Sequence, residues 1–271
     1  MTDEEIQARV QWHLESALSH IKDEAYDWFV ICAQGSMNYG LMDEASDVDT
    51  KMLVIPSLYS IALNKKPMST TLVFDNNEHC DVKDVREYFK IVRKENINFI
   101  EIFFTKYFIV NPKYVDLWYD LCVNREKIAR ANEYRFLKCA KGMVHEKEHA
   151  LCHPYPSKLD ILEKYGWDGK QLSHAARVMC FADAFICEGY SYEQCLCNEE
   201  LNPTLMELKR NKFPKTKEEA VSMMEGYVRI MDAIEVEMNV GRKDEFDPEV
   251  SDLLDCVLVE LISRKIIEKE N

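Results

Sequence analysis

The sequence lacks the features that mark several classes of protein. No run of apolar residues approaches the roughly 18 that a membrane-spanning helix requires. The acidic start, Met1 to Glu5, has neither the basic stretch nor the apolar core of a secretory signal. The ten cysteines show no paired CxxC spacing, so a zinc knuckle or ribbon is not indicated. We therefore expect a cytoplasmic protein with no membrane partner, whose cysteines are mostly reduced and buried.

Positive charge is also scarce. Lysine and arginine together number 34 against 48 aspartates and glutamates, which leaves a formal net charge of −14 at pH 7. Proteins that bind nucleic acid through a broad basic face do not have this balance. If RNA or DNA is a partner, it must meet a local basic patch on a surface that otherwise repels it.

Apolar patterning divides the chain into two halves, the first mixing helices with short strands and the second almost entirely helical. The first half is predicted to contain a helix over 5–22, strands over 28–33, 48–55, 70–74 and 79–82, a helix over 84–94, and further helix or strand over 97–110. The predicted helices of the second half span 112–123, 127–150, 169–188, 216–239 and 248–268. The sequence therefore predicts an α/β (α+β) domain over 1–110 and a helical domain over 111–271.

A glycine and a serine follow the first predicted strand. Gly35 can bring its backbone close to a ligand because it has no side chain. Ser36 can cap the helix that we expect to follow it. The N-terminus of a helix presents unpaired N–H groups and a partial positive charge, which suit a phosphate group. The Gly35–Ser36 pair is therefore a candidate phosphate-binding element.

Two aspartates follow after a spacing of ten residues. Asp47 and Asp49 lie two positions apart on the next predicted strand, which places both carboxylates on one face. Such a pair could hold hard cations such as magnesium, and a nucleoside triphosphate with its metal ions is a suitable ligand for it. Each motif alone is common, but a strand, Gly-Ser, a short helix and Asp-x-Asp in this order is far more specific.

This order of motifs resembles the signature of the DNA polymerase β-type nucleotidyltransferase superfamily. The run GSMNYGLMDEASDVDTKMLVIPS, residues 35–57, is similar to the branch called the RNA repair pathway DNA polymerase beta family. The similarity covers the first half of the chain and extends more loosely to about residue 189. It departs from the superfamily pattern at Gln34 and Thr50, which flank the glycine and the second aspartate.

The resemblance implies a metal-dependent nucleotidyltransferase, which transfers a nucleoside monophosphate from a nucleoside triphosphate to a hydroxyl group and releases pyrophosphate. ATP is the default donor. Two magnesium ions, or manganese in their place, would be held by Asp47, Asp49 and a third acidic residue. Gly35 and Ser36 would hold the β- and γ-phosphates.

The third acidic residue is predicted to be Asp81. It lies on the strand before a helix, as the family pattern implies. Asp75 and Asp84 are the alternatives, although Asp75 lies at an expected turn and Asp84 could cap the following helix.

The resemblance also implies a polymerase β-like palm over 1–110, a helical domain over 111–271 that closes the nucleotide cleft, and a basic helix that contacts the triphosphate. Lys170, His174 and Arg177 match that helix and fall on one helical stripe. An amphipathic helix with a solvated face is the alternative interpretation.

The acceptor is left open by these residues. An RNA 3′ end, especially that of a tRNA, follows from the family resemblance. A protein hydroxyl suits the acidic chain about as well, and a small molecule such as an aminoglycoside is also possible. A catalytically inactive nucleotide-binding module is the non-enzymatic alternative, but the presence of both Asp47 and Asp49 speaks against it.

Two further patterns are interpreted as structural. The segment from His145 to His149 satisfies the HExxH pattern of zinc proteases, but its two central residues are charged, so we expect a solvated helix. Glu101 lies inside an apolar run and needs a partner if buried, which favours a structural ion pair near the active site.

Overall fold

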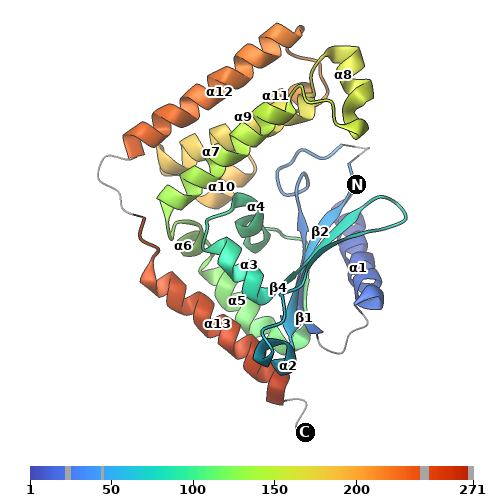
Figure 1. Ribbon diagram of the computed structural model, residues 1–271, viewed down its shortest axis with the longest axis vertical. Helices are drawn as coiled ribbons and strands as arrows, with labels where there is room; N and C mark the ends of the chain where they lie inside the picture. The colour runs from blue at the N-terminus through green and yellow to red at the C-terminus, as the bar shows by residue number, and fades with distance from the viewer. Residues whose placement is uncertain (22–25, 44–45, 239–243, 268–271) are drawn as a thin grey trace. The chain divides into compact units, whose positions relative to one another are not determined.

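The structure, a computed structural model, describes residues 1–21, 26–43, 46–238 and 244–267. The chain divides into two compact units, Met1–Ala131 with Phe246–Asn271, and Asn132–Glu245 (Figure 1). The predicted mixed α/β class is confirmed by a mixed sheet accompanied by many helices. The division differs from the predicted boundary between residues 110 and 111, because the chain from 111 to 131 and its C-terminal segment belong to the first unit.

A five-stranded mixed sheet with the strand order β3-β4-β2-β1-β5 organises the first unit. Its strands are β1 (Tyr26–Gln34), β2 (Asp49–Pro56), β3 (Ser69–Val73), β4 (His79–Asp84) and β5 (Phe108–Val110). β2 is parallel to β4, and the other neighbouring strands are antiparallel. The four predicted strands are confirmed with small shifts at their ends, and β5 lies within the segment predicted as helix or strand.

The helices of the first unit are α1 (Asp3–His20), α2 (Leu58–Ala62), α3 (Val85–Val92), α4 (Ile97–Ile100), α5 (Val115–Val123), α6 (Arg125–Ala129) and α13 (Pro248–Ile267), with short 3-10 helices at Glu101–Phe103 and Pro112–Tyr114. The predicted helix over 127–150 is wrong in one respect, because it breaks after α6. Asn132 caps the helix that follows, since its side-chain oxygen accepts the backbone N–H of Arg135.

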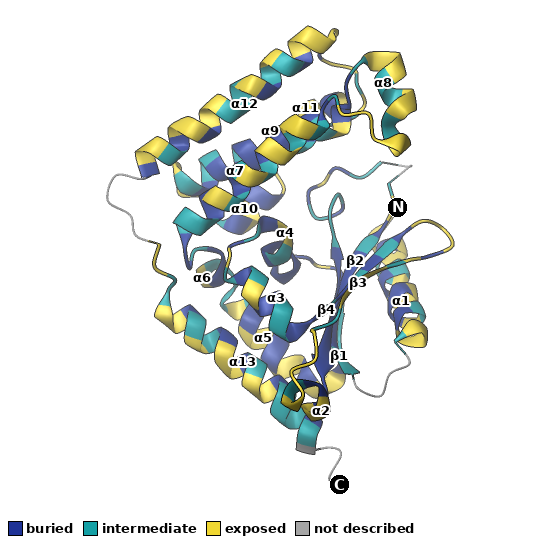
Figure 2. Ribbon diagram, in the orientation of Figure 1, coloured by how far each residue is buried: buried dark blue, intermediate teal, exposed yellow. Residues whose placement is uncertain are grey.

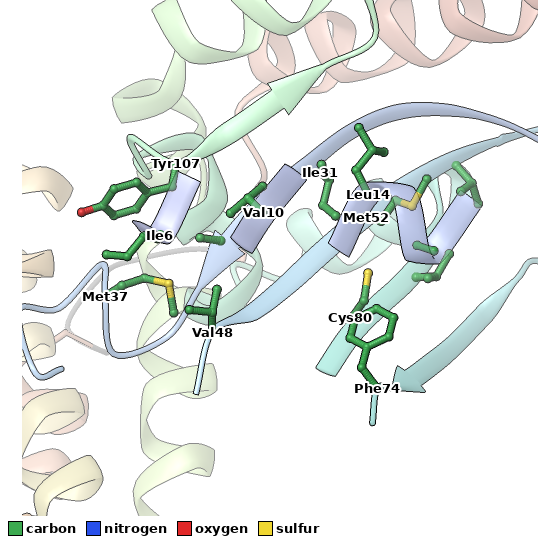
Figure 3. Packing of buried hydrophobic residues seen from close by; sticks show 14 residues of the cluster. Ile6, Val10, Leu14, Ile31, Met37, Val48, Met52, Phe74, Cys80 and Tyr107 are labelled. Carbon is green, nitrogen blue, oxygen red and sulfur yellow. The ribbon is translucent and has the colours of Figure 1, made fainter. Parts of the chain in front are cut away.

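The core on one face of the sheet is formed with α1. Apolar residues of α1 pack against alternating residues of the strands, in a cluster that Figure 3 shows from close by. Burial differs between the strands, as Figure 2 shows. The inner strand β2 is buried over nearly its whole length, whereas the edge strand β3 is largely exposed. Within this cluster lies Val48, directly before β2.

The C-terminal helix α13 packs on α3, α5 and β2 of the first unit. Its buried apolar residues recur at helical spacing, and they are Val250, Leu254, Val257 and Leu261. Arg264 pairs with Asp116 of α5 at 2.6 Å, and Lys265 Nζ donates to the carbonyl oxygen of Ile55 at 2.8 Å. The assignment of this helix to the second, helical domain is therefore not what the structure shows.

All the regular secondary structure that is described in the second unit is helical. Its helices are α7 (Glu133–Ala150), α8 (Leu159–Tyr165), α9 (Gly169–Ile186), α10 (Tyr192–Leu196), α11 (Asn202–Lys209) and α12 (Lys217–Met238), with a 3-10 helix at Pro156–Lys158. α9 contacts α7, α10, α11 and α12 and is the central helix of this unit. The short helices α8, α10 and α11 were not predicted, and the predicted helix ends at residues 22, 239 and 268 lie outside the described residues.

Among the helices described, none is both long and apolar enough to cross a lipid bilayer.

Candidate functional site

β1 ends in a turn that begins at Gly35. This residue has a φ of +90°, a conformation that L side chains rarely adopt. Residues 36–40 form a turn in which the N–H of Leu41 donates to the carbonyl oxygen of Ser36 at 2.9 Å. The predicted helix after Ser36 is therefore wrong, and no helix dipole contributes to phosphate binding at this position.

The buried carboxylate of Glu101 holds this turn in place. Its Oε1 accepts the N–H of Gly35 at 2.8 Å, and its Oε2 accepts the hydroxyl of Tyr39. The Gly35 amide, which we expected to contact a phosphate, is thus already bound. Ser36 is only partly buried, and its hydroxyl makes no hydrogen bond to any residue that the structure describes. The space beside Gly35 is open, since a Cβ there would meet no atom within 4 Å.

The register of β1 and β2 brings the turn and the aspartates to one end of the sheet. Gln34, the last residue of β1, pairs with Asp49, the first residue of β2. Gly35 and Ser36, which follow β1, therefore lie at the same end of the sheet as Asp47 and Asp49, where β2 begins. Only Asp49 lies on the strand, so the placement of Asp47 on that strand is wrong.

Asp47 and Asp49 lie on either side of the fully buried Val48, which belongs to the core cluster (Figure 3). Asp47 is exposed, and the side chain of Asp49 keeps 43% of its surface accessible. The backbone N–H of His79 donates to Asp49 Oδ1 at 3.2 Å, and His79 Nδ1 lies 3.2 Å from the same oxygen. Asp49 Oδ2 and the carboxylate of Asp47 contact no polar group within the described part of the chain.

These oxygens fit a hard divalent cation. Magnesium in nucleotide sites is commonly bound by one or two carboxylates together with phosphate oxygens and water. Asp47 and Asp49 offer such carboxylates, with three oxygens that make no polar contact in the described part of the chain, and binding of a cation by them stays a prediction.

Asp81 has a different environment. It pairs with Lys51 in the parallel register of β4 and β2, and its two oxygens lie 2.8 Å from Lys51 Nζ and 3.1 Å from Lys83 Nζ. The side chain of Lys51 is only 3% exposed, and its Nζ lies 4.0 Å from the centre of the Phe99 ring. In the described residues, no group of three or more histidine, cysteine, aspartate or glutamate side chains is positioned to hold a metal ion. A role for Asp81 as third ligand stays a prediction.

The two alternatives to Asp81 lie in ordinary structural environments. Asp84 is buried and caps α3, where it accepts the N–H of Arg86 at 2.9 Å and pairs with the guanidinium of the same residue at 2.7 Å. Asp75 is exposed in the turn between β3 and β4.

The predicted basic residues lie in α9 of the second unit. Lys170 is exposed, His174 is half-buried, and Arg177 is buried. Burial, and to a smaller extent the nearby cations Arg177 and Lys170, lowers the pKa of His174 to about 3. His174 is therefore neutral at physiological pH and supplies no positive charge. Binding of a nucleotide by these three residues stays a prediction.

The neutral state of His174 makes stability depend on pH. Its pKa is depressed in the folded state, so the unfolded chain binds a proton below its ordinary pKa near 6.5 and stability is lost as the pH falls. From pH 7 to pH 5 we expect the free energy of unfolding to fall by about 2 kcal/mol because of this residue. Urea denaturation at both pH values should show a smaller loss for His174→Gln than for the wild type. An equal loss in both proteins would contradict this assignment.

Several polar residues around the aspartates were not predicted. They are His13, Lys51, Glu78, His79 and Lys83. Two of them could have been recognised in the sequence as ionisable residues at positions predicted to be buried. His13 lies on the apolar stripe of a predicted helix, and Lys51 lies on a predicted buried strand. Ionisable residues at such positions require buried partners. Glu78 and His79 carry no comparable signal.

The HExxH segment lies on α7 as a solvated surface, as predicted. Both of its histidines are exposed, and His145 Nδ1 lies 3.0 Å from Glu148 of the same helix.

No protein-family model and no curated protein matches this chain. Among solved structures, the chain is similar to a nucleotidyltransferase-like protein from Exiguobacterium sibiricum 255-15. The two share 9% sequence identity with a TM-score of 0.30, and the match covers 84% of this chain and 74% of the other.

Proposed function

We propose that this protein is a nucleotidyltransferase, which transfers a nucleoside monophosphate from a nucleoside triphosphate, ATP by default, to a hydroxyl group. The observation that carries the proposal is the register of β1 and β2, which brings Ser36 to the same end of the sheet as Asp47 and Asp49. Accessible carboxylates beside an open turn suit a triphosphate with its metal ion.

In the proposed reaction, the oxygen of the acceptor hydroxyl bonds to the α-phosphorus. The bond between that phosphorus and the oxygen bridging to the β-phosphate breaks, so that pyrophosphate leaves and the hydroxyl proton passes to solvent. Magnesium held by Asp47 and Asp49 would supply charge neutralisation on the phosphate oxygens. The Ser36 hydroxyl would donate to a phosphate oxygen, and Asp81 would be the third carboxylate that holds the metal.

The acceptor is proposed to be an RNA 3′ end, and a protein or small-molecule hydroxyl is the alternative. The protein should be incubated with each α-labelled nucleoside triphosphate, magnesium, total RNA and cell protein. Label in RNA supports the first acceptor, and label in protein or in a small molecule supports the alternative. Nucleotide binding without any transfer would replace the enzymatic proposal with the inactive binding module.

The turn at Gly35 provides a separate prediction. Alanine at this position forces a side chain into the φ of +90°, at a cost of about 1 kcal/mol. Gly189 is a matched control, since its φ is +75° and a Cβ there also meets nothing within 4 Å. Both variants should lose similar thermal stability, whereas only Gly35→Ala should raise the KM for the nucleotide. Equal nucleotide KM values in the two variants would remove Gly35 from the proposed site.

A further inference from the structure

A buried polar cluster lies beneath the aspartate segment, on the face of the sheet that α1 covers. His13 of α1 is completely buried, as is Thr50 of β2, and Glu78 is only 5% exposed. The elements that carry these residues are far apart in the sequence. Polar groups at such depth are expensive to bury unless each has a partner.

The buried polar cluster includes hydrogen bonds to the residues on both sides of Asp49. Glu78 Oε1 accepts the backbone N–H of Val48 at 3.2 Å, and Glu78 Oε2 lies 2.9 Å from His13 Nε2. The other ring nitrogen of His13, Nδ1, lies 2.9 Å from the hydroxyl oxygen of Thr50. The residues immediately before and after Asp49 are therefore tied to one hydrogen-bonded unit.

Glu78 is also held by other groups and is linked directly to the partner of Asp49. Asn76 Nδ2 donates to its Oε2 at 2.8 Å, and Arg9 Nε lies 3.5 Å from the same oxygen. The next residue along the chain is His79, whose backbone N–H donates to the carboxylate of Asp49. Burial acts to raise the pKa of Glu78, but the hydrogen bonds from His13 and Val48 bring the pKa below its usual value.

Packing of α1 on the sheet does not require the polar cluster of His13, Thr50 and Glu78. The surrounding residues of the sheet and of α1 are apolar, and an apolar side chain at position 13 would continue the buried stripe of Val10 and Leu14. The hydrogen bonds run to the segment between Asp47 and Asp49, which carries the accessible carboxylates of the site. This arrangement suits the orientation of ligands by hydrogen bonds from behind.

We propose that Glu78 and His13 are positioning residues for the Asp47–Asp49 cation site. Glu78 fixes the backbone of Val48, and His13 fixes both Glu78 and Thr50, so that the two carboxylates are held ready for one cation with its nucleotide. This inference rests on the proposed function, and it adds a second set of residues on which cation binding depends.

The test measures binding rather than turnover. The manganese complex of α,β-methylene-ATP, which cannot be cleaved between the α- and β-phosphates, is titrated into the protein, and water-proton relaxation reports bound manganese. Glu78→Ala should raise the dissociation constant at least about tenfold, as loss of a group that orients metal ligands does. Glu78→Gln should bind more tightly than Glu78→Ala, because its amide oxygen still accepts from Val48 and its NH₂ group can donate to His13, although that NH₂ group cannot accept from Asn76.

Leu14→Ala is the control for lost stability. Leu14 follows His13 in the sequence and is buried in the hydrophobic cluster between α1 and the sheet, but it makes no polar contact with the aspartate segment. It should lower the thermal midpoint and leave the dissociation constant unchanged at temperatures where the protein is folded. Equal weakening in Leu14→Ala and Glu78→Ala would show that the cluster acts through stability alone and would overturn the inference.

The remaining outcomes separate this inference from the proposed function. Asp49→Asn serves as the reference for loss of the site. If Asp49→Asn abolishes binding of the manganese–nucleotide complex and Glu78→Ala binds it as the wild type does, the positioning role is wrong and the cation site is supported. If Glu78→Gln binds as weakly as Glu78→Ala, hydrogen-bonded positioning is overturned in favour of a simple charge effect. If the wild type and Asp49→Asn bind equally, the cation site itself is wrong.

Discussion

Replacing Asp49 by asparagine is expected to abolish nucleotidyl transfer, with a loss of at least about 1,000-fold, or about 4 kcal/mol of transition-state stabilisation. The amide keeps an oxygen that can accept from His79, so local structure is preserved. It removes the negative charge that a divalent cation requires. Asp47→Asn, which alters an exposed side chain, should have a similar effect on transfer.

The measurement is incorporation of label from α-labelled nucleotide at saturating magnesium, with circular dichroism to confirm folding. Asp252→Asn is the matched control, because Asp252 is an exposed aspartate of α13 in the same unit and it contacts no other polar group in the described chain. It should transfer at the wild-type rate. Substantial transfer by both Asp47→Asn and Asp49→Asn would defeat the assignment of the cation site.

The largest effect on stability is expected for Gly169→Ala, at about 3 kcal/mol of unfolding free energy. A Cβ at Gly169 would lie 2.1 Å from the carbonyl oxygen of Leu208 and 2.7 Å from Asn211 Oδ1. The Leu208 oxygen belongs to the backbone of α11 and cannot rotate away. Asn211 is itself fixed, since its Nδ2 donates to the carbonyl oxygen of Trp167 at 3.0 Å. The helices α9 and α11 would have to separate.

At Gly142, in the same unit, substitution by alanine is expected to have the opposite effect on stability. It lies in the interior of α7, is exposed, and a Cβ there would meet nothing within 4 Å. Gly142→Ala should stabilise the protein by about 0.5–1 kcal/mol, because alanine restricts the unfolded chain and favours helix. Calorimetry on the two variants should give shifts of opposite sign in the transition of the second unit. If Gly169→Ala unfolds at the same thermal midpoint as the wild type, the close packing of α9 on α11 is contradicted.

The prediction of a short helix after Ser36 was wrong for a physical reason. Ser36 is a good helix cap, and local preference alone favours a helix after it. The hydrogen bond of Gly35 to Glu101, across 66 positions of sequence, instead holds the turn at a positive φ. A contact over that separation leaves no periodic signal in either segment.

Glu101 likewise separates what the sequence can predict from what only the fold decides. The sequence indicated that a carboxylate inside an apolar run needs partners, from which we expected a structural ion pair near the active site. It did not indicate that the partners are the Gly35 amide and the Tyr39 hydroxyl. The need for a partner is a property of one residue, but the identity of the partner is a property of the fold.

The sequence by itself determined the strands of the sheet, most of the long helices and the spacing of Gly35, Ser36, Asp47 and Asp49, because burial periodicity and turn chemistry act over a few residues. Only the tertiary structure decided that α13 belongs with the sheet, that Lys51 neutralises Asp81 across strands 30 positions apart, and that His13 and Glu78 meet across 65. Each of these depends on strand register or helix docking, which bring together groups that no short-range pattern relates.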